Sequence, residues 1–317
     1  MIEIFMYDHD KNEIIALDIK NLPEKKDKLL WVDVTSINKE EAEILRSTFD
    51  LHPLTVEDLS SWNTRVKVEE FNGYLLSVFY SIKNSKKIIE LEEIDYVLGN
   101  NYIISNHKNT LDVTEELKKD RERLASLFKK GPDFIMHRLL DKEIDNFFPV
   151  LEHLDDELED IEEKVIKRPR PELMTQVLKL KRTLRGVKRT SFQQREKISY
   201  LAKNNYKFIS KKSIPYFRDV YDHAIRVSDS IDNYREAIGE TFDAYMSAVN
   251  NSMNEVMKML SMIATIALPM TVISGIYGTN FQILPGASYK YGFWIMIGGM
   301  CALCAFMLHN FRKRKWM

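Results

Sequence analysis

The sequence predicts an α+β membrane protein with an N-terminal α/β domain, a long helical stalk and two transmembrane helices. Three observations predict this fold class. Residues 1–110 alternate short β-rich runs with helical ones, almost only helical patterns follow, and two apolar runs lie near the C-terminus. The expected division is a cytoplasmic α/β domain at 1–140, a cytoplasmic helical hairpin and stalk at 141–250, and a two-helix transmembrane domain at 251–317.

Charge is distributed very unevenly along the chain. The 317 residues carry a formal net charge of −1, so whole-chain charge gives no case for nucleic-acid binding. The composition of 44% apolar and 29% charged residues is typical of a soluble protein. Apart from a basic C-terminal tail, however, nearly all of the charge lies at or before Lys258. The average therefore conceals a soluble part and an apolar part.

The first third of the chain predicts strands and two short helices. The runs expected to be strands are rich in Val, Ile, Tyr and Phe: EIFMY, LLWVDV, YLLSVFYSI and IDYVLGNNYIIS. Between them NKEEAEILRSTF and HPLTVEDLSS have helical patterns. Asn38 is the expected N-cap of the first helix, because Glu41 follows three residues later in the spacing of a capping box.

A hairpin of two long helices is expected after the α/β domain. The segment 133–167 predicts one amphipathic, strongly acidic helix, and residues 151–163 alone hold eight Asp or Glu. These acids form either a solvated face or a cation-attracting surface that works with the basic tail. The prolines of KRPRPE at 167–172 end this helix, and a basic helix follows that should pair with it antiparallel.

The longest predicted helix begins after Pro215. Apolar residues recur at alternating spacings of three and four, which is a heptad-like seam: Val220, Ala224, Val227, Ile231, Tyr234, Ile238, Phe242, Tyr245 and Val249. An unbroken helix over 216–277 would be about 90 Å long. We interpret so long a seam as a contact between copies, and therefore expect an oligomer with the helices around an axis.

Two apolar runs predict membrane spans, at about 259–277 and 291–308. Each approaches the roughly 20 residues that cross a bilayer. Buried core helices are the alternative, but a soluble core helix of this length normally shows a polar stripe. Arg312–Lys315 follows the second span, so the positive-inside rule puts both termini in the cytoplasm and the 280s loop outside. Cys301 and Cys304 lie within an apolar span without further ligands, which favours packing over metal or redox chemistry.

One face of the first span combines polar and apolar residues at helical spacing: Asn254, Met257, Leu260, Ala264, Leu268, Thr271 and Gly275. Lipid contact does not require Asn or Thr. A pore lining with polar ends and an apolar constriction fits this pattern. A helix-packing face also contains Thr, Ala and Gly, and the face by itself leaves both interpretations open.

The segment YGTNF at 277–281 resembles the CorA family of divalent-cation channels, whose signature at this place is Tyr-Gly-Met-Asn-Phe. The resemblance covers nearly the whole chain. It extends to HPLTVEDL at 52–59, YFRDVYDHAIRVSDSIDNYRE at 216–236, NEVMKMLSMIATIALPMTVISGIYG at 254–278 and the terminal RKRKWM. It implies a funnel-shaped homopentamer in the plasma membrane, with the first transmembrane helix lining the pore and Mg²⁺ as the usual ion.

The resemblance also assigns residues. It implies a selectivity filter at Gly278, Thr279 and Asn280, with Thr279 standing where the family has Met. It implies pore and gate positions at Asn254, Met257, Leu260, Leu268 and Thr271. It further implies that Asp219 and Asp243 bind regulatory Mg²⁺ between subunits, with Glu90, Glu92 and Glu93 as candidates for a further carboxylate near Asp219. The loop 281–289 has no acidic residue, so it should gather cations weakly.

The expected function is Mg²⁺ influx, with hydrated Mg²⁺ selected by a ring of Asn280 amides and flow gated by cytoplasmic Mg²⁺. Neutral amides accept hydrogen bonds from the first-shell water that Mg²⁺ releases reluctantly. The alternatives are a Zn²⁺, Co²⁺ or Ni²⁺ transporter of the same fold and a membrane Mg²⁺ sensor that does not conduct. Motifs for enzymatic phosphate or metal chemistry do not occur, so neither an enzyme nor a small organic substrate is expected.

Overall fold

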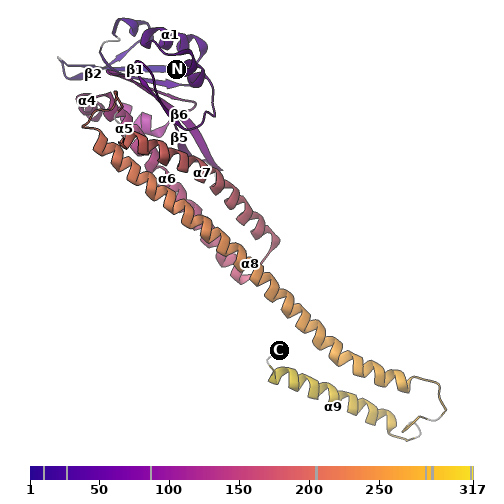
Figure 1. Ribbon diagram of the computed structural model, residues 1–317. Coiled ribbons are helices and arrows are strands. Elements are labelled where there is room, and N and C mark those ends of the chain that lie inside the picture. The colour runs from indigo at the N-terminus through magenta and orange to yellow at the C-terminus, as the bar shows by residue number, and fades with distance from the viewer. Residues whose placement is uncertain are drawn as a thin grey trace. The chain divides into compact units, whose positions relative to one another are not determined.

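The computed structural model describes residues 1–9, 11–25, 28–85, 88–203, 206–282, 284–286, 289–314 and 316 (Figure 1). Lys315 of the predicted basic tail and residues 283, 287 and 288 of the predicted outer loop lie outside this set. The chain divides into two compact units. The first comprises residues 1–163 and 171–242, and the second comprises residues 164–170 and 243–317.

The first unit contains a seven-stranded mixed sheet. Its strands are β1 (Ile2–Asp8), β2 (Glu13–Leu17), β3 (Leu29–Thr35), β4 (Lys67–Glu70), β5 (Leu75–Ser85), β6 (Ile88–Leu98) and β7 (Tyr102–His107). The order across the sheet is β2-β1-β3-β7-β6-β5-β4. β3 and β7 pair in parallel, and the other neighbours pair antiparallel. The four predicted strand regions are confirmed, whereas the short edge strands β2 and β4 were not predicted.

The predicted run IDYVLGNNYIIS forms two strands rather than one. β6 ends at Leu98 and β7 starts at Tyr102, so the intervening Gly-Asn-Asn makes a hairpin turn. A Cβ atom at Gly99 would come within 2.2 Å of the Tyr102 ring, and this close approach explains the glycine.

Helices cover both faces of the sheet (Figure 1). On one face α1 (Lys39–Phe49) and α2 (Pro53–Ser60) pack on a core that includes Ile4 and Met6 of β1. The alternate residue Tyr7 points to the other face, where its ring stacks on Phe128 of α4 (Arg121–Phe128). α3 (Asp112–Lys119) and α5 (Pro132–Asp145) complete that layer, and the short 3₁₀ helices η1 (Ile19–Asn21) and η2 (Pro23–Lys25) precede β3.

The predicted cap of α1 is confirmed. The Asn38 side chain accepts a hydrogen bond from the Glu41 backbone N–H at 2.9 Å, and the Glu41 carboxylate accepts one from the Asn38 N–H at 3.0 Å. The two side chains satisfy backbone donors that a helix start otherwise leaves unpaired.

The acidic segment 133–167 was expected to be one helix, and this prediction is wrong. α5 ends at Asp145, and α6 (Phe147–Lys167) follows after Asn146. Pro149 supplies the reason. A proline has no N–H for the carbonyl four residues earlier, which here belongs to Asp145, and its ring clashes with that carbonyl. The predicted hairpin itself is confirmed, because α6 ends at Lys167 and α7 (Pro171–Lys203) starts at the second proline of KRPRPE.

α8 (Ile214–Tyr277) is the predicted unbroken long helix. The seam residues Val220, Ala224, Val227, Ile231 and Ile238 are buried within the single chain. Contacts beside the seam come from the hairpin: Lys188 of α7 pairs with Asp232, and Thr241 donates a hydrogen bond to Glu162 of α6 at 2.5 Å. The interpretation of the whole seam as a contact between copies is therefore wrong for this stretch. Beyond it, Phe242 is exposed and Tyr245 and Val249 are half-buried.

The second unit contains the C-terminal part of α8 and α9 (Gly292–Lys313). Both helices are long and apolar enough to cross a membrane, and the apolar stretch of each is unburied within the chain. α9 runs five residues beyond the predicted end of the second span, through the basic Arg312 and Lys313. The two expected spans are thus present as helices of sufficient length and hydropathy.

Candidate functional site

The predicted pore face of α8 is uncovered. Met257, Leu260 and Leu268 are 60%, 63% and 70% exposed, and Asn254 and Thr271 are exposed as well. The half-buried residues of the same stretch form a different stripe: Met262, Ile266, Pro269, Met270 and Ile273. At 3.6 residues per turn this stripe lies on the opposite side of the helix. The chain therefore covers one side of α8 and leaves the predicted pore face free for contacts outside the chain.

The N-terminal end of this face, at Asn254, is polar and open. Asn254 and Met257 line a hollow of about 490 Å³ together with Glu255, Lys258 and the C-terminal Trp316. Among the described residues, none makes a hydrogen bond to the Asn254 amide. A polar group without a protein partner at this place remains available to water or to a hydrated ion.

Hydroxyl groups at the other end are bound to the backbone. Thr271 Oγ1 donates to the Ala267 carbonyl at 2.9 Å, and Ser274 Oγ donates to the Thr271 carbonyl at 3.1 Å. Such local bonds let an apolar helix carry hydroxyls at little cost. The Thr271 oxygen keeps its acceptor capacity and can still receive a hydrogen bond from water.

In the turn that follows α8, some side chains are hydrogen-bonded to the backbone and one is not. Thr279 is held to the helix end, because its Oγ1 donates to the Ile276 carbonyl at 2.7 Å. Tyr277 braces the loop through a 3.0 Å hydrogen bond from its hydroxyl to the Pro285 carbonyl. The Asn280 side chain is exposed and has no hydrogen-bond partner within the part of the chain that the structure describes. Thr279 is thus bound to the local backbone, and Asn280 is left as the free amide of the turn. The next residue, Phe281, is 76% exposed in the single chain.

Gly278 is required by space rather than by an unusual dihedral angle. A Cβ atom there would lie 3.1 Å from the Ser274 carbonyl oxygen, which is tighter than nearly all real contacts of this kind. The positive-φ glycine of this region is Gly286, with φ of 80°. Gly278 therefore allows a close turn directly at the end of α8.

The negative electrostatic potential at this turn comes from the C-terminal end of α8. Residues 259–289 contain no acidic side chain. The last carbonyls of an α-helix lack intrahelical partners, and the aligned peptide dipoles place about half a negative charge at the C-terminus. A cation at the turn after Tyr277 therefore meets a moderately negative site without a carboxylate that would bind it tightly.

A second polar cluster lies in the first unit and joins α5 to α8. His223 Nδ1 is 2.7 Å from Asp145 Oδ1 and 3.7 Å from Asp141 Oδ1, and His223 Nε2 is 4.0 Å from Asp219 Oδ1. Ligand atoms of Asp141, Asp145 and His223 all lie within 4.8 Å of one another, a spacing that could hold a metal ion. Asp219, predicted as a metal ligand, thus has neighbours that the sequence analysis missed.

The cluster contains a carboxyl group that is poorly satisfied. Asp141 Oδ1 is buried without a hydrogen bond. Burial, and then the charge of Asp145, raise the pKa of Asp141 above its usual value, although His223 and Arg138 oppose this shift. A bound cation would favour the ionised carboxylate. The sequence held a signal for the cluster, because Asp141 with Asp145 and Asp219 with His223 are each spaced by four residues and so share a helix face.

The other predicted cation ligands are not brought together within the chain. Asp243 is exposed on α8. Glu92 accepts a hydrogen bond from the Asn109 N–H at 2.6 Å, and Glu93 accepts one from the Thr64 N–H at 2.7 Å. The sites predicted for Asp219 and Asp243 involve a neighbouring copy, so they remain predictions.

Comparison with known proteins decides the family. The sequence profile described as "CorA-like Mg2+ transporter protein" matches residues 26–313. The chain belongs to this family. The cobalt/magnesium transport protein CorA of Thermotoga maritima is 34% identical over 291 residues, which cover 90% of this chain and 83% of that protein. The divalent cation transporter CmaX of Pseudomonas aeruginosa is 25% identical over 315 residues, covering 97% and 92% of the two chains.

The fold is shared with a full-length member of the CorA family. The complete structure of the CorA magnesium transporter from Methanocaldococcus jannaschii superposes with a TM-score of 0.84 at 25% identity, covering 100% of this chain and 99% of that one. The predicted family is therefore confirmed, together with an N-terminal α/β domain and two apolar C-terminal helices.

Proposed function

We propose that the chain forms a homopentameric channel for Mg²⁺ influx in the cell membrane, with both termini in the cytoplasm and α8 lining the pore. One observation carries the proposal: Asn280 is an uncommitted amide in the turn at the end of α8, beside Thr279, whose hydroxyl is bound to the backbone. A symmetric assembly around α8 would gather the Asn280 amides into a ring. Gly278, Thr279 and Asn280 together then make the selectivity filter.

The ring of Asn280 amides recognises Mg²⁺ through the water molecules bound to the ion. Mg²⁺ holds its six water molecules tightly, so a filter that strips them would be slow. Amide oxygens accept hydrogen bonds from first-shell water, and the helix C-terminus adds a moderate negative potential. A ring of carboxylates could hold the ion too long for rapid release. The absence of acidic residues from the sequence 259–289 suits passage better than storage.

The gate is a stack of apolar rings from Met257, Leu260 and Leu268, which the single chain leaves 60–70% exposed. A narrow apolar ring stops ions by excluding water, and small changes in its diameter wet or dry it. Asn254 and Thr271 flank the rings with polar groups that hydrate the ion before and after the constriction.

Cytoplasmic Mg²⁺ regulates the gate by binding carboxylates of the stalk. Asp219, with Asp141 and Asp145 close by, offers the oxygen ligands that Mg²⁺ prefers. The buried, unbonded Asp141 Oδ1 fits a cation-bound water or the cation itself. Asp243 is a second regulatory position further along α8. Binding favours the conformation whose carboxylates lie closest together, so rising internal Mg²⁺ closes the channel.

Transport of Co²⁺, Ni²⁺ or Zn²⁺ is the second candidate function. The observation that favours it is His223 between Asp141 and Asp145, because imidazole suits these ions better than Mg²⁺. The relative from Thermotoga maritima is named a cobalt/magnesium transport protein. A third possibility is a membrane sensor that binds Mg²⁺ without conducting it.

Ion flux into liposomes separates the three. The full chain is reconstituted, and uptake of Mg²⁺, Co²⁺, Ni²⁺ and Zn²⁺ is followed with trapped indicators at equal concentrations. We expect Mg²⁺ uptake that falls when Mg²⁺ is preloaded inside. Uptake of the transition metals without Mg²⁺ would support the second candidate, and Mg²⁺ binding without any uptake would support the sensor.

A further inference from the structure

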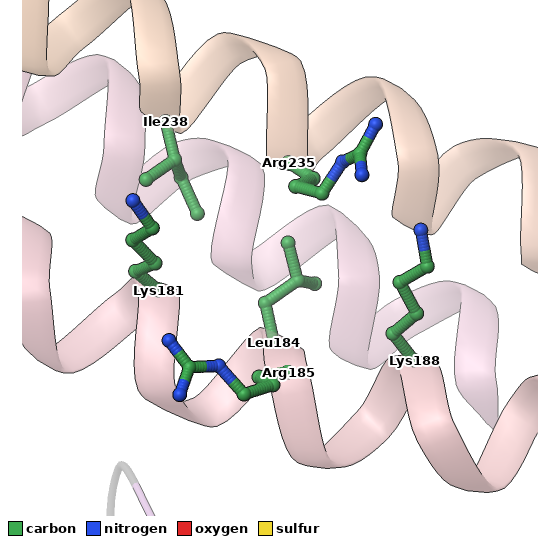
Figure 2. A pocket seen from close by; sticks show the side chains of 6 residues that line it. All are labelled: Lys181, Leu184, Arg185, Lys188, Arg235 and Ile238. Atoms are coloured by element: carbon green, nitrogen blue, oxygen red, sulfur yellow. The ribbon is translucent and has the colours of Figure 1, made fainter.

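A basic groove runs between α7 and α8 in the first unit. Its lining residues are Lys181, Leu184, Arg185 and Lys188 of α7 with Arg235 and Ile238 of α8, around a cavity of about 100 Å³. In Figure 2 Leu184 and Ile238 point into the gap between the two helices, while Lys181 and Lys188 rise on either side of Leu184. The groove therefore has an apolar floor and a cationic rim.

The positive charge of the groove is only partly offset. Asp232 pairs with Lys188 and lies 3.9 Å from Arg235. Lys181 and Arg185 are exposed and have no acidic partner among the residues that the structure describes. Four basic side chains around one carboxylate leave a surplus of positive charge, which within one chain only water and dissolved ions would balance.

The complementary surface lies on α6 of the same helical bundle. Glu152, Asp155, Asp156 and Glu159 are exposed there and carry no ion pair within the described part of the chain. We call these four residues the acidic stripe. Burial together with the charges of Asp155, Glu152 and Asp156 raises the pKa of Tyr234, which places this stripe on the Tyr234 flank of α8. Arg235 belongs instead to the flank that faces α7.

The basic groove and the acidic stripe cannot form ion pairs with each other within one chain. The apolar side of α6, with Leu154, Leu158 and Ile161, is buried in the bundle, so its acids point outward. The groove opens in the crevice between the other two helices. A contact between two different surfaces of identical chains is heterologous, and repetition of it closes a ring when the rotation per copy allows.

We infer that the acidic stripe on α6 of one copy docks in the basic groove between α7 and α8 of the next copy. The inference rests on the proposed homo-oligomer and names a cytoplasmic contact within it. The stripe supplies carboxylates to Lys181 and Arg185, and the methylene groups of its side chains cover the floor of Leu184 and Ile238. A small organic anion would occupy only the groove and leave the stripe without a partner.

Cross-linking between differently tagged copies tests the contact. Cys301 and Cys304 are replaced by Ser, then full-length Arg185→Cys chains with one tag and Asp156→Cys chains with another are co-expressed in membranes and treated with a short bis-maleimide. Lys179→Cys is the matched control on the far side of α7, where it is also exposed. We expect several-fold more product carrying both tags for Arg185→Cys than for Lys179→Cys. Equal yields would overturn the inference.

A charge swap gives an independent answer. Arg185→Glu and Asp156→Lys should each lower the fraction of oligomer that survives gel filtration in detergent several-fold, because each variant brings like charges together. The double variant should recover most of the loss, and Lys179→Glu should cause none. Loss without recovery in the double variant would contradict the contact and would indicate a small anion in the groove. If Mg²⁺ flux is intact but the double variant does not recover the oligomer, the proposed function stands and this contact is wrong. If the double variant recovers the oligomer but wild type shows no Mg²⁺ flux, the contact stands and the proposed function is wrong.

Discussion

The sheet of the first unit and the membrane helices of the second treat polar groups in opposite ways. In the sheet, the buried carboxylate of Asp33 accepts a hydrogen bond from Ser105, lies 3.0 Å from His107 Nε2 and 2.7 Å from Lys118 Nζ. In the second unit the Asn280 amide has no protein partner among the described residues, and Leu268 is 70% exposed. The charges of this network pair within their own chain, whereas the exposed side chains of the two apolar helices find no such partners there.

This contrast supports the placement of the proposed site on the second unit. A buried network whose charges pair with one another specifies a fold and leaves little free chemistry. Unpaired polar groups and exposed apolar side chains indicate contacts that lie outside the chain. Variants that act in only one of the two regions test this difference.

Loss of Asp33 should have the largest effect, and only on folding. Asp33→Ala removes the partner of His107 and Lys118 and leaves both without their common buried counter-charge. Breaking a buried ion pair from one side costs about 3–5 kcal/mol. Denaturant unfolding of the full chain, followed by tryptophan fluorescence to which the buried Trp31 contributes, should report this loss. The control Glu43→Ala breaks an exposed pair with Arg46 and should change little. Equal stability of the two variants would remove the network from its structural role.

Opening of the apolar rings should affect only conduction. Met257→Ser or Leu260→Gly wets the constriction, so Mg²⁺ leak at high internal Mg²⁺ should rise about tenfold, equivalent to about 1.4 kcal/mol of barrier. Ile263→Ser is the control, because Ile263 is also exposed but lies off the pore face. Unchanged leak in both test variants, with normal assembly, would exclude these residues from the gate.

Neutralisation of Asp219 should shift regulation without changing the open pore. If Asp219 shares a cation with its neighbouring carboxylates, Asp219→Asn should raise the internal Mg²⁺ needed for half closure about fivefold, the lower end of usual allosteric couplings. Asp229→Asn on the exposed side of the same helix is the control. Closure at the wild-type Mg²⁺ concentration would show that Asp219 is an ordinary solvated acid.

The smallest effect is a pH dependence of the sheet network. Burial opposes ionisation of Asp33, yet the hydrogen bond and charge of His107, with Lys118, hold its pKa below the usual 3.8. Burial likewise opposes protonation of His107, but Asp33 raises its pKa above the usual 6.5. The Asp33 contribution is therefore lost as pH falls below about 4, and the His107 contribution is lost as pH rises above about 6.5.

Thermal unfolding of wild type and His107→Gln across this range measures that dependence. The stability advantage of the wild type should be greatest between about pH 4 and 6.5 and should narrow as the solution becomes alkaline. A constant advantage up to pH 9 would mean that His107 does not change its protonation state in the folded protein across this range.

Local patterns predicted much of the fold. The cap at Asn38, the break at KRPRPE and the length of α8 follow from residues close in sequence, and all three are confirmed. The break between α5 and α6 was also local, in Pro149, but the acidic periodicity on both sides concealed it. The hairpin at Gly99 could have been found from the Gly-Asn-Asn turn signal.

Tertiary partners were harder to predict. Periodicity showed that Val220 to Ile238 is an apolar seam, but it could not tell whether α6 and α7 or another copy would cover it. Likewise the spacing of four between Asp219 and His223 was visible, yet their approach to Asp141 and Asp145 depends on how α5 packs on α8. The residues predicted for the pore face lie on one continuous side of α8, since the helix is regular there. That this side lines a pore stays a prediction.

The central claim is that Asn280, and not Thr279, recognises the ion. Mg²⁺ uptake into liposomes is compared for wild type, Asn280→Ala and Thr279→Met, with and without hexaammine cobalt, a mimic of the hydrated ion whose ligands do not exchange. The account predicts that Asn280→Ala abolishes selective uptake in an assembled oligomer, while Thr279→Met stays within a few-fold of wild type and remains blocked. Loss of transport in Thr279→Met, together with intact uptake and block in Asn280→Ala, would contradict it.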